Sequence, residues 1–204
     1  MLIKTLTVGQ LETNCYVVTN EEVLECVVID PGDESNTILN YIEDNKLSCK
    51  AIMLTHAHFD HVGAVHAILE ATGAEFYMCE KDRILIDSGA SGRFQLPENV
   101  KFYKDGDEVQ VAGLSFRVME TPGHTLGGVT LICGDAIFTG DTLFRGSCGR
   151  TDLPGGDMRE ELRSLKRIAE LEGDYEVYPG HAESSMLSIE RAYNPYMRHA
   201  IEKM

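Results

Sequence analysis

The sequence predicts an α+β fold of two halves, approximately residues 1–100 and 101–204, packed sheet to sheet within one domain. Short apolar runs separated by Gly, Pro, Asn and Asp, as in paired strands, open each half. Runs with apolar residues at helical spacing follow them in each half. A chain of 204 residues, 43% of them hydrophobic, is long enough to bury such a core without disulfides.

The first half begins with a predicted meander of three strands, at Leu2–Val8, Cys15–Val18 and Cys26–Asp30. A helix follows the third strand, and either Asp33 or Ser35 can cap its amino end.

A buried strand is predicted next, from the apolar run Ala51–Leu54. We expect a helix from Val62 to Thr72 and a further strand at Glu75–Cys79. Residues 88–95, which contain Gly and Ser, predict a mobile loop that can border a site.

The second half begins with hairpins. Gly134-Asp135 is a favourable two-residue turn between strands at Val129–Cys133 and Ala136–Thr139. Asp157 and Glu160 form a capping box at the start of a helix. A strand at Tyr175–Tyr178 and a helix from about Ser185 to Tyr193, which breaks at Pro195, complete the half.

The net charge of the chain limits the classes of partner that it can bind. Lys and Arg number 18 against 33 Asp and Glu, for a formal charge of −15, which repels nucleic acid and anionic membrane surfaces. The six cysteines form no CxxC pair and lie mostly in apolar runs, as expected of reduced thiols in a cytoplasmic protein. No apolar run approaches the length of a signal peptide core or a membrane span.

Three histidines and one aspartate fall within six residues directly after the strand at Ala51–Leu54. In an extended segment, side chains two residues apart point the same way, so His56 and His58 can face one ion. Asp60 and His61 then enter the following helix beside the same space. Imidazole and carboxylate together suit zinc, iron, manganese or nickel, and the cluster therefore predicts a metal site.

Three later strands also end in ligand-type residues, each preceded by glycine: His124, Asp141 and His181. Glycine permits a sharp turn and lets backbones crowd around a small centre. The candidate metal ligands are therefore His56, His58, Asp60, His61, His124, Asp141 and His181. Seven ligands exceed what one tetrahedral ion takes and match two ions that share a carboxylate. His66 and His199 are expected on the surface.

Four motifs carry a family resemblance. Thr-His-Ala-His-Phe-Asp-His, Pro-Gly-His-Thr, Thr-Gly-Asp-Thr-Leu-Phe and Tyr-Pro-Gly-His, in that order, resemble the motifs of the metallo-β-lactamase superfamily over essentially the whole chain. The resemblance implies a four-layer αββα sandwich of two mixed sheets flanked by helices, with the metals at one edge. It also implies that one metal binds His56, His58 and His124, that the other binds Asp60, His61 and His181, and that Asp141 bridges them.

The segment Gly140–Asp152 is similar to the glyoxalase II branch and to its persulfide dioxygenase relatives. The chain ends at Met204, before the helical extension of glyoxalase II, and Arg150 stands where that enzyme has a glutathione-contacting lysine. The Asn194-Pro195-Tyr196 segment is similar to short, single-domain glyoxalase II-like hydrolases.

The ligand set and this resemblance together predict a dinuclear metallohydrolase that acts on a thioester of the S-lactoylglutathione (hydroxyacyl-thiol) type or on a related acyl-thiol. Two divalent ions, zinc first and iron or manganese as alternatives, can hold a bridging hydroxide as the nucleophile. Asp60 can orient that hydroxide, and Asp141 completes the catalytic pair. No nucleophilic serine is recognisable, and Cys148 is expected to be a structural thiol.

Arg145 and Arg150 are the candidate substrate-binding residues, because cations can pair with carboxylates of a thiol carrier. Either can instead pair with Asp152 or Asp157 to hold its loop. The alternative enzyme class is a persulfide dioxygenase with one iron on His56, His124 and Asp141. The third hypothesis is a metal-binding protein of this fold without catalytic activity. The sequence does not indicate the oligomeric state.

Overall fold

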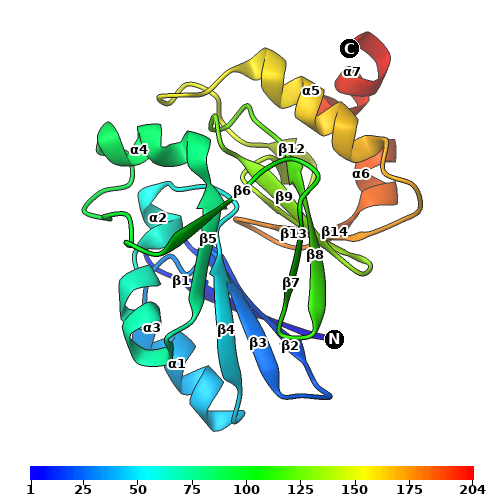
Figure 1. The fold of residues 1–204 in the computed structure, drawn as a ribbon. Helices are drawn as coiled ribbons and strands as arrows, with labels where there is room; N and C mark the ends of the chain where they lie inside the picture. The colour runs from blue at the N-terminus through cyan, green and yellow to red at the C-terminus, as the bar shows by residue number, and fades with distance from the viewer.

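Two six-stranded β-sheets pack against each other in the computed structural model, which describes residues 1–204 (Figure 1). The first sheet has the order β1-β2-β3-β4-β5-β6 and is formed by Leu2–Val8, Thr13–Asn20, Glu25–Ile29, Ser48–Met53, Glu75–Cys79 and Val100–Tyr103. The second has the order β14-β13-β10-β9-β8-β7 and is formed by Ser185–Met186, Glu176–Pro179, Ala136–Gly140, Val129–Cys133, Leu114–Glu120 and Glu108–Val111.

Both sheets are mixed. In the first, β1 to β3 form the antiparallel meander and β3 to β6 run parallel. In the second, β10 and β13 are parallel and the other neighbours are antiparallel. A small separate sheet pairs β11 (Leu143–Phe144) with β12 (Ser147–Cys148).

The helices cover the outer faces of the two sheets (Figure 1). Beside the first sheet lie α1 (Ser35–Asp44), α2 (Phe59–Val62), α3 (Val65–Thr72), η1 (Glu80–Asp82) and α4 (Arg83–Asp87). Beside the second lie α5 (Met158–Ala169), α6 (Leu187–Tyr193) and α7 (Pro195–Lys203).

Strand β2 shows why the chain forms four layers. Its side chains alternate between two buried clusters, with Cys15 and Val17 on one face and Tyr16 and Val18 on the other. The first cluster lies between this sheet and helices α1 and α3, and the second lies between the two sheets. A third cluster joins the second sheet to α5, α6 and α7. The predicted αββα sandwich is therefore confirmed.

The predicted helix from Val62 to Thr72 is in fact two helices. Gly63 and Ala64 interrupt it, because the Ala64 N–H donates to the Pro31 carbonyl at 3.0 Å. A Cβ on Gly63 would lie 2.3 Å from the Gly32 carbonyl oxygen, so only glycine permits this close approach. The break places α2 beside β2 and the segment that follows β3, where Thr13 and Asp30 contact Asp60 and His61.

Other boundaries also differ from the sequence prediction. The cap of α1 is Glu34 rather than Asp33 or Ser35, and its side chain makes no capping hydrogen bond. Short strand β14 takes the residues before α6, which begins at Leu187. Pro195 does end α6, but it also opens α7, because proline fits a first helical turn that the Asn194 side chain caps.

The loop at residues 88–95 makes long-range hydrogen bonds. Ser91 is 2% exposed, and its hydroxyl donates to the Ala57 carbonyl. The Phe59 N–H donates to the Ala90 carbonyl at 3.2 Å. These long-range contacts hold the middle of the segment beside the histidine cluster, and its mobility stays a prediction.

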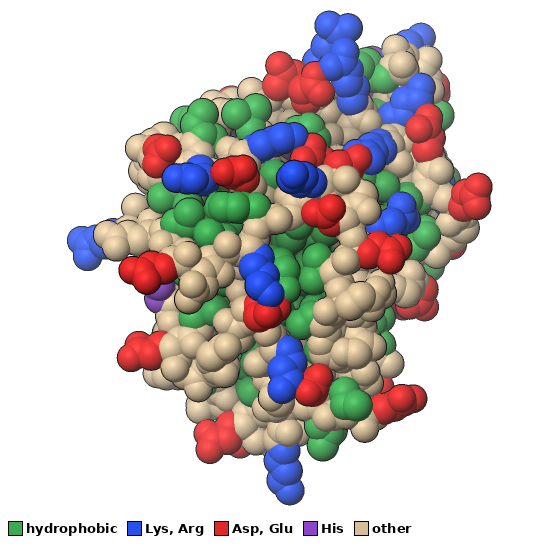
Figure 2. All heavy atoms as spheres, in the orientation of Figure 1, with side chains coloured by type: hydrophobic (Ala, Val, Ile, Leu, Met, Phe, Trp, Pro, Cys, Tyr) green, Lys and Arg blue, Asp and Glu red, His purple; other side chains and the backbone are tan.

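Charged side chains of both signs are interspersed over the face shown in Figure 2. No helix of the chain has the length and apolar character that crossing a bilayer requires.

Candidate metal centre

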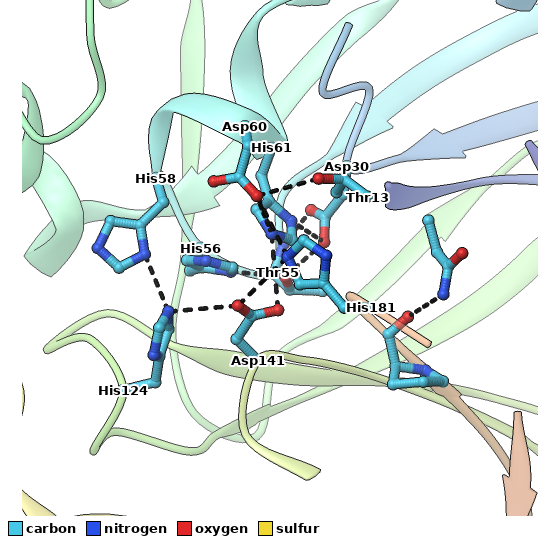
Figure 3. A network of polar contacts seen from close by, with 12 residues as sticks. Thr13, Asp30, Thr55, His56, His58, Asp60, His61, His124, Asp141 and His181 are labelled. Atoms are coloured by element: carbon cyan, nitrogen blue, oxygen red, sulfur yellow. Dashed lines mark hydrogen bonds and ion pairs between the residues drawn. The ribbon is translucent and has the colours of Figure 1, made fainter. Parts of the chain in front are cut away.

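Strand ends from both sheets deliver the candidate ligands to one place (Figure 3). The segment after β4 carries His56 and His58 and continues into α2, which carries Asp60 and His61. The segments after β8, β10 and β13 supply one ligand-type residue each: His124, Asp141 and His181. Residues that lie up to 125 positions apart in the chain therefore meet at one edge of the sandwich.

Three histidines form a first group, the His124 triad of His56, His58 and His124. One ring nitrogen from each lies within 4.8 Å of the others. His58 Nδ1 and His124 Nε2 are 2.9 Å apart. All three residues are buried, with exposed fractions of 3%, 6% and 5%.

A second group, the His181 triad, consists of Asp60, His61 and His181, whose ligand atoms also lie within 4.8 Å of one another. Asp60 Oδ2 is 3.2 Å from His181 Nε2 and 3.5 Å from His61 Nε2. The His181 side chain is 25% exposed, so this triad opens towards solvent.

Asp141 lies between the two triads. Its Oδ2 is 3.5 Å from His124 Nε2 and 3.6 Å from His181 Nε2. Its Oδ1 is 3.6 Å from His61 Nε2. One carboxylate therefore contacts both groups, in the position that a bridging ligand requires.

Four of the five histidines are held through one ring nitrogen while the other faces the centre. His61 Nδ1 lies 3.1 Å from Asp30 Oδ2, and His124 Nδ1 lies 2.7 Å from the Arg150 carbonyl. His181 Nδ1 lies 3.0 Å from the Leu11 carbonyl. His56 Nδ1 lies 3.1 Å from the Thr55 hydroxyl. Partners of this kind fix ring orientation and tautomer in metal sites.

The donor atoms fit divalent cations. His56 Nε2, His58 Nε2, His61 Nε2 and Asp141 Oδ1 are buried without a hydrogen-bond partner. Buried polar atoms are rarely left unpaired, and each such atom calls for an explanation. Three of these atoms are on histidines of the two triads, and the fourth is on Asp141, which contacts both triads. Imidazole and carboxylate donors of this kind suit zinc or iron.

The two triads differ in their protonation. Burial lowers the pKa of all three histidines in the His124 triad. Neighbouring imidazoles lower the pKa of His56 and His58 further, and that of His58 falls to about 4. Burial also opposes protonation of His61, but the carboxylates of Asp141 and Asp30 outweigh it and raise the pKa of His61 to about 9. The pKa of His181 is raised in the same way by Asp60 and Asp141.

Glycine lets the backbone pass close to this centre at Gly180. A Cβ there would lie 2.1 Å from Asp141 Oδ1 and 2.9 Å from His61 Cε1. Any other residue would push the carboxylate or the imidazole out of place.

Sequence reasoning missed two buried carboxylates that support the site. Asp30, at the end of β3, accepts hydrogen bonds from the Thr55 N–H at 2.7 Å and from the Thr55 hydroxyl, besides its contact with His61. Asp82 accepts from the N–H groups of Ala57, at 2.9 Å, and Gly127, at 2.6 Å. It thereby ties the histidine segment to the loop that carries His124. Burial raises the pKa of Asp82 to about 6.

A signal for Asp30 was present in the sequence, because it too is a polar residue directly after a strand. No comparable signal marks Asp82, whose partners lie 25 and 45 residues away.

The two predicted substrate-binding arginines take different positions. Arg150 lines the cavity above the triads, and its guanidinium pairs with Asp152 through two hydrogen bonds of 2.7 and 2.8 Å. Arg145 pairs with Glu183 and lines a separate hollow beside Ser184 and Ser185. The geometry therefore gives no support to substrate binding by Arg145. Cys148 lines the cavity, and burial raises the pKa of its thiol to about 12.

Comparisons with known proteins agree with this geometry. The family model described as "Metallo-beta-lactamase superfamily" matches residues 8–181. The "Hydroxyacylglutathione hydrolase GloC" of Haemophilus influenzae is 32% identical, over 97% of this chain and 98% of the relative. Among solved structures, the BLEG-1 B3 metallo-beta-lactamase is 30% identical to this chain and has a TM-score of 0.87. The superposition covers 96% of this chain and 99% of the BLEG-1 chain. TTHA1623 in a di-iron-bound form is 38% identical to this chain and has a TM-score of 0.84. The superposition covers 95% of this chain and 99% of the TTHA1623 chain.

The matched region contains all seven side chains of the centre, and the relatives span nearly the whole chain. The chain belongs to the metallo-beta-lactamase superfamily.

Proposed function

We propose that this chain is a dinuclear metal-dependent hydrolase of thioesters, with hydroxyacyl-thiols of the S-lactoylglutathione type as the first class to test. The observation that carries the proposal is the pair of complete ligand triads with Asp141 in contact with both. The GloC relative, whose name describes a hydroxyacylglutathione hydrolase, supports the choice of substrate class.

The His124 triad would hold one ion, and the His181 triad would hold the other. Asp141 would bind both ions. Bound divalent ions supply a nucleophile at neutral pH, because they lower the pKa of coordinated water, and they polarise the substrate carbonyl.

Asp60 is placed to orient the attacking water. Thr13 donates to its Oδ2 at 3.0 Å, and His181 Nε2 contacts the same oxygen at 3.2 Å. In this proposal the other carboxylate oxygen would accept a hydrogen bond from the attacking water. A fixed acceptor of this kind contributes by positioning the nucleophile before attack.

Water rather than a side chain acts as the nucleophile in this proposal. The only thiol lining the cavity is that of Cys148, and burial together with the nearby Glu161 keeps its pKa far above neutral. The thiolate is the reactive form of cysteine, so this group stays a poor nucleophile at neutral pH.

The test is a thioester hydrolysis assay on protein purified without chelator, with metal content measured on the same sample. We expect thiol release from S-lactoylglutathione that is lost after chelation and restored by zinc or by iron. Absence of hydrolysis from every thioester tried, with both ions bound, would exclude the proposal. Oxygen uptake with a persulfide and a single iron per chain would instead favour the dioxygenase.

A further inference from the structure

The centre lies at the base of a cavity of about 840 Å³ whose walls are largely apolar. Both halves of the chain contribute these walls through six residues: Leu11, Phe59, Ala90, Phe144, Leu153 and Pro154. Leu11 and Phe59 are 52% and 54% exposed, which is high for apolar side chains beside a polar centre. Exposed apolar surface of this kind is typical of ligand-binding sites.

Charged groups in the cavity are few. Asp60 and Asp141 belong to the proposed metal centre, and Arg150 is the only lysine or arginine among the lining residues. Its guanidinium is already occupied by both carboxylate oxygens of Asp152. No unpaired lysine or arginine side chain therefore faces the cavity.

This charge distribution suits some thioesters better than others. A glutathione thioester carries two carboxylates and an ammonium group, and carboxylates are recognised by Arg forks or clustered N–H donors. An apolar acyl chain needs only apolar walls, and it gains free energy as it leaves water.

From these observations, and resting on the proposed thioester hydrolysis, we infer that the preferred substrates are thioesters with a medium-length aliphatic acyl group. The acyl chain packs between the walls that contain Leu11 and Leu153, while the charged part of a carrier such as glutathione contributes little. Reaction adds water across the thioester C–S bond, so a carboxylate and the free thiol leave the cavity.

The first experiment compares N-acetylcysteamine thioesters from acetyl to octanoyl, with S-lactoylglutathione, on the metal-loaded protein. We expect kcat/KM to rise by up to about fourfold per added CH₂, the ratio that corresponds to burying one methylene. We expect S-lactoylglutathione to be at least tenfold poorer than the hexanoyl thioester. A flat series, or a preference for S-lactoylglutathione, would overturn the inference and leave thioester hydrolysis standing. Failure of all thioesters would remove both.

A second experiment reads binding without turnover. S-hexyl and S-methyl thioethers of N-acetylcysteamine, which cannot be hydrolysed, are titrated into the metal-loaded protein by calorimetry. The hexyl compound should bind at least tenfold more tightly, and the S-hexyl thioether of glutathione no more tightly than the cysteamine one. Equal affinity for hexyl and methyl compounds would contradict the inference.

Variants locate the effect. Leu153→Ser should raise KM for the hexanoyl thioester more than for the acetyl thioester, because a longer chain loses more contact. Ile201→Ser is the control, since Ile201 is an exposed apolar residue on α7 and lies outside the cavity. An equal rise in KM for both thioesters in Leu153→Ser would contradict acyl-chain binding at Leu153.

Discussion

The His124 triad and the His181 triad are built from similar donors but lie in different surroundings. The first has three buried imidazoles whose pKa values are lowered. The second contains a carboxylate, opens to solvent at His181, and has two histidines with raised pKa values. The difference arises from where the carboxylates lie, because Asp30, Asp60 and Asp141 all act on His61.

This difference indicates that the two ions are not equivalent. A histidine with a lowered pKa is already neutral at pH 7 and can accept an ion directly. In the His181 triad, by contrast, the pKa values of His61 and His181 are raised, so protons compete with an ion for these imidazoles. We therefore expect tight, pH-insensitive binding at the His124 triad and weaker, pH-dependent binding at the His181 triad.

The largest effect is expected where the two triads join. Asp141→Ala should lower kcat/KM by roughly a thousandfold or more and release at least one ion, because the carboxylate contacts both triads. Thioester hydrolysis and elemental analysis measure the two losses. Asp135→Ala is the control, since Asp135 lies at the other end of β10. A variant of Asp141 that keeps both ions and full activity would remove its bridging role.

Removing one histidine from each triad separates the two ions. His181→Ala should leave one ion bound, held by the intact buried triad, and should lower hydrolysis by about a hundredfold because the second ion is lost. His56→Ala should instead weaken the tighter ion. Native mass spectrometry counts the ions in each variant. Identical losses from the two variants would mean that the triads do not act separately.

Asp30→Asn tests the support beneath His61. The amide cannot accept from Thr55 and His61 as the carboxylate does, so we expect metal affinity at the His181 triad to fall by about 10- to 100-fold. Competition with a fluorescent chelator measures the affinity. Asp33→Asn, a change at an exposed carboxylate on the same loop, should leave it unaltered. Unchanged affinity in the Asp30 variant would exclude the supporting role.

The pH dependence of metal loading compares the triads in the unaltered protein. Below about pH 9, His61 of the metal-free protein holds a proton that an ion must displace. Affinity at the His181 triad should therefore fall as pH decreases, by up to about tenfold per unit for each displaced proton. We expect two ions per chain at pH 8.5 and closer to one at pH 6. Calorimetry in buffers of different ionisation enthalpy should also detect proton release on loading, and its absence would contradict the raised pKa.

The smallest effect concerns the two arginines outside the triads. Arg150→Ala should raise KM by a few fold at most, because its exposed guanidinium is paired with Asp152, and exposed pairs contribute little. Arg145→Ala should leave both kcat and KM unchanged, since it lines another hollow. Steady-state kinetics with a glutathione thioester measures kcat and KM for both variants. A tenfold rise in KM for Arg145→Ala would restore it as a substrate contact.

The fold and the convergence of the candidate ligands could be predicted because their signals are local. Alternating burial along β2 and the ligand-type residues after β4, β8, β10 and β13 are all visible in short segments. The ordered motifs then suggested how the two triads pair.

The supporting contacts could not be predicted, because they depend on depth and on distant neighbours. Asp30 follows a strand as Asp141 does, but it lies beneath His61 rather than facing the centre. Asp82 joins two loops that only the fold brings together. The break at Gly63 likewise depends on the approach of Gly32 from another segment.

The most direct test of two unequal ion sites is a stepwise chelator titration of the fully loaded protein, followed by native mass spectrometry at pH 7. We predict two ions per chain at saturation and a well-populated one-ion species as chelator is added, with hydrolysis lost in parallel with the first ion. A single ion at saturation with full hydrolysis would contradict the account.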